Sequence, residues 1–285
     1  MVLAHDRGRK DGWGREDYSF TGIHMRKSLL LGLSALATTS IFAAPAAAAE
    51  LGGGFTVSGG ATIVSDYRFR GISQTFKNFA IQGTVSLSHE SGLYATVWGS
   101  SIDDYVAFGG DTELDLIVGY KHAFGGTTVD VGVIYYYYPG SSQILSGINS
   151  DFFEPYISVA HTFGPVTAKA SAAYGFKQKA LAFANTKDDN LYIAGDLSAA
   201  LPGTPITLTA HVGHTFGPSY LSLGFDDYTD WSLGASYTTG PLTLGVSYVD
   251  TNKTAVTTSN PFDCCGTNQK NIMKAGVVGS VSVAF

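Results

Sequence analysis

Three charged side chains stand within five residues of one another near the start of the chain: Asp66, Arg68 and Arg70. Alternate residues of an extended strand point to the same face, so the three would form one charged wall. On a wall that lines a water-filled lumen, two guanidinium groups attract anions and repel cations. The structural alternative is that Asp66 pairs with one of these arginines, or that the arginines clamp acids from other strands. The two interpretations are compatible, because a wall of salt bridges can still filter ions.

Further charged residues fall on the same inferred face of later segments. The set is mixed in sign and acidic on balance, so its charge alone predicts no preference for anions. The candidate pore-lining residues, besides the first three, are Glu113, Asp115, Lys121, Asp130, Glu154 and Lys169.

These side chains are carried by segments in which apolar and polar residues alternate with period two. The segments are about ten residues long or slightly longer, which is the length that a tilted strand needs to cross the hydrocarbon of a bilayer. Twelve are expected, near residues 55–70, 79–90, 92–102, 112–124, 127–138, 152–163, 166–178, 190–201, 205–216, 228–239, 242–252 and 272–285.

The connections between the segments alternate strictly between tight and long. The tight ones are rich in residues that favour hairpin turns: Ser91-Gly92, Gly125-Gly126, Gly164-Pro165, Pro202-Gly203-Thr204 and Gly240-Pro241. The long ones are polar or mixed. Short turns at one end and long loops at the other are typical of an outer-membrane barrel, whose tight turns face the periplasm.

The last segment shows the expected facing most plainly. Apolar or small residues occupy every second position from Met273 to the terminal Phe285, while Lys274, Ser280 and Ser282 share the other face. The segment is similar to the closing strand of bacterial outer-membrane barrels, in which the terminal aromatic residue also serves as the signal for the assembly machinery. By the same parity rule, Tyr67 and Phe69 of the first segment are expected to face lipid.

The N-terminal region resembles an export signal. Basic residues at Arg26 and Lys27 precede an apolar run and an Ala-rich stretch, which predicts a signal peptide over residues 25–49 that is cleaved before Glu50. Residues 1–24 then read as a spurious upstream extension, with a cytoplasmic tail on an uncleaved anchor as the alternative. The chain carries a net charge of −6, which argues against a nucleic-acid partner.

No pattern in the sequence predicts a cofactor, a metal site or catalysis. A small hydrolase barrel is the enzymatic alternative, but no Gly-x-Ser-x-Gly elbow is present and no serine has a recognisable spacing to a histidine. Acidic loop pairs such as Asp103-Asp104 are expected to be solvated charge rather than a calcium site. The adjacent Cys264 and Cys265 lie in a loop-like stretch, and a disulfide between neighbours would be strained.

Seven segments after residue 50 form a recognisable series: Ser65 to Thr75, Glu90 to Tyr94, Val97 to Ser100, Tyr138 to Gly140, Glu154 to Tyr156, Asp227 to Trp231 and Leu244 to Asn252. In this order they resemble the TorF-like porin family of proteobacteria, and the resemblance extends over nearly the whole chain after residue 50. The resemblance implies an outer-membrane location in a Gram-negative bacterium but no substrate and no catalytic residue.

The sequence therefore predicts an all-β protein: residues 50–285 form a single 12-stranded antiparallel transmembrane β-barrel with short periplasmic turns and longer extracellular loops. Only a closed barrel satisfies every backbone polar group of such strands in lipid. The expected partners are outer-membrane lipid, the assembly machinery through Phe285, and small hydrophilic solutes that diffuse through a narrow charged lumen. The alternative is a closed structural or adhesive barrel, which an inner face of paired charges would favour.

Overall fold

Twelve long strands form the wall of the molecule in a computed structural model, which describes residues 48–141, 150–182, 188–258 and 269–285. The wall strands are β2 (Phe55–Val64), β5 (Ala80–His89), β6 (Leu93–Ser101), β7 (Thr112–Phe124), β8 (Thr127–Tyr137), β9 (Phe152–Phe163), β10 (Val166–Gln178), β11 (Asp188–Ala200), β12 (Ile206–Phe216), β13 (Asp227–Thr239), β14 (Leu242–Thr251) and β17 (Gly276–Ala284). No helix in the described part of the chain is long and apolar enough to cross a membrane.

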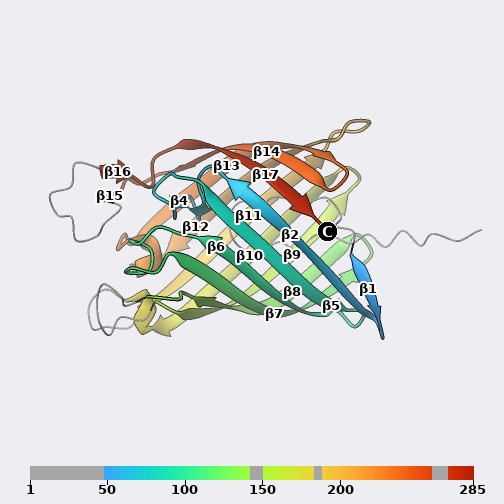
Figure 1. Ribbon diagram of the computed structural model, residues 1–285, viewed down its shortest axis with the longest axis horizontal. Coiled ribbons are helices and arrows are strands. Elements are labelled where there is room, and N and C mark those ends of the chain that lie inside the picture. The colour runs from blue at the N-terminus through green and yellow to red at the C-terminus, as the bar shows by residue number, and fades with distance from the viewer. Residues whose placement is uncertain (1–47, 142–149, 183–187, 259–268) are drawn as a thin grey trace, which may run out of the picture. The chain divides into compact units, whose positions relative to one another are not determined.

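Each wall strand pairs antiparallel with its neighbour along the chain, and β17 pairs with β2 to close the barrel (Figure 1). The predicted 12-stranded antiparallel barrel is therefore confirmed. Ten of the twelve strands match their predicted bounds to within two residues at each end. The prediction succeeds because alternation and turn chemistry are local signals that read directly from the sequence.

The two faces of the wall differ in the way that the alternation predicts. On β7, Leu116 and Val118 are about half exposed on the outside, whereas Glu113 and Asp115 are buried on the lumen side. Exposed aliphatic and aromatic side chains recur at outward positions of all twelve strands. This outward face suits lipid, and the inward face is polar and charged.

The seam between β17 and β2 is built around one glycine. Gly59 N–H donates to Phe285 O at 2.8 Å, and Phe285 N–H donates to Gly59 O at 2.9 Å. A Cβ atom on Gly59 would lie 2.7 Å from the Phe285 ring, so the missing side chain makes room for the terminal aromatic. Beyond Phe285, the short strand β1 (Ala49–Gly52) pairs with the remaining edge of β2.

The first predicted strand, 55–70, is wrong at its far end. β2 stops at Val64, and the chain turns inward to form a small hairpin of β3 (Arg68–Phe69) and β4 (Ile72–Ser73). Tyr67 and Phe69, which were expected to face lipid, are buried inside. Arg70 and Gly71 have positive φ angles of 48° and 80°, a backbone conformation that ends an extended strand.

The last predicted strand, 272–285, begins four residues too early. Met273 was placed on the lipid face but is buried with Ile272 against Ile72 and Phe76 of the inward-turning segment. The outward placement of Val277, Val281, Val283 and Phe285 is confirmed.

Short elements occur in the loops between the wall strands. The loops hold β15 (Val256–Thr258), β16 (Gln269–Asn271) and the 3-10 helices η1 (Lys179–Leu181) and η2 (Tyr220–Ser222). The predicted upstream extension and signal peptide, apart from the last residues before Glu50, lie outside the described residues, as do Cys264 and Cys265.

Candidate functional site: a loop held inside the barrel

The connection between β2 and β5, residues 65–79, runs inside the barrel and is called the inward loop below. Its side chains contact lumen-facing groups from strands around much of the wall. Tyr67 packs on Trp98 of β6 with ring centroids 5.5 Å apart, and Phe69 packs edge-on against Tyr136 of β8 at 5.9 Å. Tyr228 of β13 donates to the backbone oxygen of Arg70 at 3.0 Å. The loop therefore crosses the lumen rather than lining one side of it.

Arg68 fastens the inward loop to itself and to the chain ahead of β17. Its Nε lies 2.6 Å from Asp66 Oδ2, and Nη1 donates to the backbone oxygens of Gly71, Ile272 and Lys274 at 2.9 to 3.2 Å. Ser73 Oγ donates to the other oxygen of Asp66 at 2.6 Å. A planar, multidentate donor of this kind fixes the geometry of a loop as well as its charge.

Arg70 fastens the loop to the opposite wall. Its Nη2 lies 2.7 Å from both carboxylate oxygens of Glu154 on β9, and Nη1 donates to Asn190 Oδ1 on β11 at 3.0 Å. The guanidinium also lies over the ring of Tyr192 at 4.3 Å, a cation–π contact. Arg68, Arg70 and Glu154 are 0 % exposed. Both arginines are therefore buried and paired with acidic residues, as the structural alternative describes.

The tight fit continues at Gly71, next to the anchor. A Cβ atom there would lie 2.5 Å from Thr251 of β14 and 2.9 Å from Asp230 of β13. With a φ of 80° as well, the position accommodates glycine and little else.

Two buried acids, Glu113 and Asp115, face the lumen from the same strand, β7. Both side chains are almost fully buried, and Tyr138 Oη donates to Glu113 Oε1 at 3.4 Å. In the described part of the chain, no group of three or more His, Cys, Asp or Glu residues has an arrangement that could hold a metal ion.

The remaining predicted residues form cross-strand pairs on the lumen wall. Lys121 lies 3.5 Å from its register partner Asp130, and Lys169 lies 3.0 Å from its register partner Asp196. Lys121 is the most accessible of these four, with 25 % of its side chain exposed.

The Lys169–Asp196 ion pair belongs to a longer network, whose other members are not among the predicted site residues. Asp196 Oδ1 lies 2.7 Å from His211 Nδ1, and His211 Nε2 lies 3.1 Å from Asp230 Oδ1. Tyr192 donates to both oxygens of Asp230 at 3.2 Å, which joins the network to the tyrosine ring under Arg70. The parity of the 228–239 segment places Asp230 on the lumen face and could have signalled it.

This network does not have the geometry of a hydrolase triad. The ring nitrogen of His211 that would activate a nucleophile meets the Asp230 carboxylate and the Tyr192 hydroxyl. The described serine–histidine contact, Ser91 with His89 at 2.8 Å, lies at an exposed tight turn. A triad needs the acid, the histidine and the nucleophile in one chain of hydrogen bonds.

A second loop, residues 102–111, supports the inward loop from the barrel end. Asp103 N–H donates to Gln74 O at 2.8 Å, and the Tyr105 hydroxyl donates to the backbone oxygen of Ser73. Burial and the neighbouring Asp104 raise the pKa of Asp103 to about 6, because both disfavour its charged form.

Comparison with known proteins places the chain in a family. A model described as bacterial protein of unknown function (Gcw_chp) matches residues 48–278. The chain belongs to this family. No curated protein sequence matches it. This match does not test the more specific resemblance to TorF-like porins, which stays a prediction.

Solved structures that align with this chain include a porin and an outer-membrane channel. A NanC porin aligns with a TM-score of 0.50 and 11 % identity over 80 % of this chain and 98 % of its own. The outer-membrane channel DcaP of Acinetobacter baumannii aligns with a TM-score of 0.40 and 11 % identity, over 81 % and 98 %. At such identity the NanC match shows a shared fold and nothing about the solute.

Proposed function

We propose that the protein is a narrow outer-membrane channel through which small hydrophilic solutes diffuse, with the inward loop as its constriction. The apolar outward face and the closed wall support residence in the outer-membrane lipid. The charged lumen, with its lysine–aspartate pairs on the wall, supports passage of polar solutes. The resemblance to TorF-like porins agrees with this proposal.

The observation that carries the proposal is the path of the inward loop across the lumen. A barrel of twelve strands is wider than the eight-stranded barrels that side chains alone fill, so its bore is set by what folds into it. Here Arg68 and Arg70 hold the loop at both sides of that bore. The constriction formed by the inward loop then selects solutes by size, and the charged wall selects them by charge.

A closed structural or adhesive barrel is the second candidate, and the buried ion pairs of the inward loop favour it. Arg68 is paired with Asp66 and Arg70 with Glu154, with all four side chains buried. In such a barrel the inward loop would be a permanent plug and the outer loops would bind a partner.

Single-channel recording in a planar bilayer separates the two candidates. The wild-type protein should give a small conductance, and Glu154→Gln should enlarge it or make it fluctuate because the inward loop loses its anchor. The matched control is Asp111→Asn, which neutralises an exposed acid in another loop. If neither the wild type nor Glu154→Gln conducts, the channel proposal is wrong and the closed barrel stands.

Membrane residence has a separate test that requires no conductance. A folded barrel resists mild detergent and migrates faster on a gel before heating than after it. We expect such heat-modifiable migration for protein extracted from outer membranes, with the signal peptide cleaved before Glu50. Deletion of Phe285 should reduce the folded fraction in vivo, since this residue is the proposed contact for the assembly machinery. A soluble protein that shows no change on heating would contradict the assignment.

A further inference from the structure

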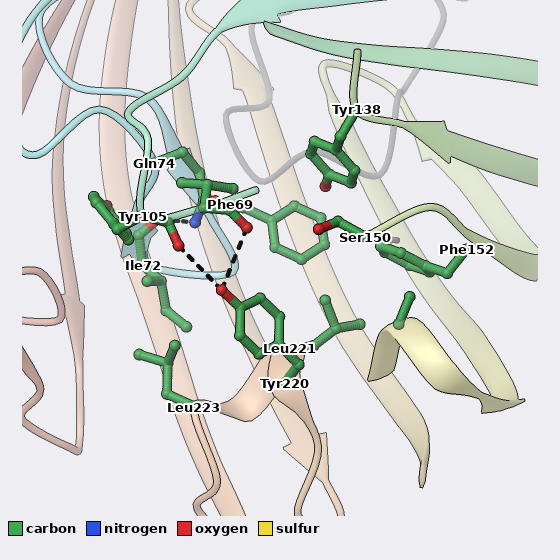
Figure 2. A pocket seen from close by; sticks show the side chains of 12 residues that line it. Phe69, Ile72, Gln74, Tyr105, Tyr138, Ser150, Phe152, Tyr220, Leu221 and Leu223 are labelled. Carbon is green, nitrogen blue, oxygen red and sulfur yellow. Dashed lines mark hydrogen bonds between the residues drawn. The ribbon is translucent and has the colours of Figure 1, made fainter. Parts of the chain in front are cut away.

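A cavity opens between the inward loop and residues of four other loops at the same end of the barrel (Figure 2). It encloses about 560 Å³, counting the part open to solvent. Phe69 and Ile72 of the inward loop form one side, and η2 contributes Tyr220 and Leu221.

The lining of the cavity is neutral and consists mainly of aromatic and aliphatic side chains. Among the described residues that line it, none carries a formal charge. Five lining residues are aromatic: Phe69, Tyr105, Tyr138, Phe152 and Tyr220. Burial raises the pKa of Tyr220 to about 12, so its hydroxyl remains protonated at neutral pH. Aromatic walls of this kind favour flat aromatic ligands, which gain edge and face contacts beyond their buried area.

Polar atoms occur at a few points of this lining. Tyr220 Oη donates to the backbone oxygen of Tyr105 at 3.0 Å, and Tyr138 Oη donates to Glu113 at 3.4 Å. Ser150 is 7 % exposed, and its Oγ has no hydrogen-bond partner among the described residues. An unsatisfied buried hydroxyl costs free energy that a bound polar group can recover. Figure 2 shows Ser150 beside Tyr138 on one side of the cavity.

We propose that this cavity is a binding site for a small neutral aromatic molecule that carries a hydroxyl group. The ring packs among the aromatic side chains, and the ligand hydroxyl pairs with Ser150 Oγ. Anionic analogues are excluded, since no cation lines the cavity and the Glu113 carboxylate lies directly behind Tyr138. The site stands independently of solute passage, because binding requires only the loops at one end.

The test is equilibrium binding of p-cresol to the full-length protein folded in detergent micelles, measured by calorimetry against empty micelles. Toluene is the probe without a hydroxyl, and p-toluate is the anionic probe. We expect p-cresol to bind more tightly than toluene and p-toluate not to bind. Ser150→Ala should weaken p-cresol about three- to tenfold, the usual net contribution of one hydrogen bond, and leave toluene unchanged.

Cavity-filling variants provide the second arm. Ala180→Phe, from a half-buried lining position, should abolish p-cresol binding, and Leu221→Trp fills the cavity from another side should the first variant misfold. Lys179→Phe is the matched control, since this neighbour in η1 is exposed and does not line the cavity. Unchanged p-cresol binding by a folded cavity-filled variant, or equal binding of p-toluate, would overturn the assignment.

Discussion

Arg70 and Glu154 are 84 residues apart in the chain, and Arg70 Nη2 lies 2.7 Å from both oxygens of the Glu154 carboxylate. Both side chains are wholly buried inside the barrel. Desolvation of two charges is costly, and the pair offsets that cost only while both partners are present. The contact therefore acts as the latch that joins the inward loop to strand β9.

Breaking this latch from one side should be worse than removing it altogether. Glu154→Gln leaves Arg70 buried without its counter-charge, and we expect it to lower the free energy of unfolding by about 3 to 5 kcal/mol. The double variant Arg70→Met with Glu154→Leu should lose less, because no uncompensated charge remains. Urea unfolding in detergent, followed by tryptophan fluorescence, measures the free energy of unfolding of the single and the double variant. Equal losses in the single and double variants would show that the ion pair itself matters little.

The barrel seam offers a steric test. Gly59→Val should impair closure, since its side chain would meet the Phe285 ring and the backbone oxygen of Thr84, at 2.7 and 2.8 Å from the Cβ atom. Overpacking of this kind costs about 1 to 3 kcal/mol. The temperature at which gel migration shifts should fall.

Gly83→Ala is the control for the seam variant. Its Cβ atom would meet one backbone oxygen at 3.9 Å on the neighbouring strand, so it should leave the transition unchanged. A seam that tolerates valine at position 59 as well as alanine at position 83 would refute the packing role of Phe285.

Ion selectivity should respond to the two arginines if the barrel conducts. Arg68→Ala with Arg70→Ala removes two positive charges and leaves Asp66 and Glu154, so the K⁺ to Cl⁻ permeability ratio should rise about twofold or more. The reversal potential in a KCl gradient measures this ratio. Arg68→Lys with Arg70→Lys keeps the charge and should keep the ratio. An unchanged reversal potential in the alanine variant would leave both arginines as structural anchors only.

The support loop should make stability depend on mild acidity. The pKa of Asp103 is raised to about 6, above the ordinary value of about 3.9, so the folded state favours its protonated form. This contribution is fully present below about pH 4 and is lost as the pH rises through about 6. Asp103 is partly exposed, and after allowance for solvent screening the effect is about 1 kcal/mol.

Asp103→Asn should remove this dependence and raise the stability at pH 7. Unfolding midpoints measured at pH 4, 5, 6 and 7 give the comparison, with the exposed Asp111→Asn as the control. If wild type and Asp103→Asn show parallel pH profiles, Asp103 is not the titrating group.

The wall of the barrel could be predicted from the sequence because its signals are local. Strands such as β7 (Thr112–Phe124) and β9 (Phe152–Phe163) match their predicted bounds, since a period-two alternation ends where a turn residue begins. The same parity places Glu113, Asp115 and Lys169 on the lumen face, where the structure has them. The short cross-strand pairs follow from register alone.

The path of the inward loop depends on contacts that form only in the folded barrel. The alternation continues through Tyr67 and Phe69, so the pattern predicts that both lie on a strand and face lipid. Their burial depends instead on partners such as Trp98 and Tyr136, and Arg68 reaches Ile272 from 204 residues away. Such contacts exist only once the barrel has closed, because closure alone brings those groups to one point. The wall and its two faces thus follow from the local pattern of residues, whereas long-range packing selects what fills the lumen.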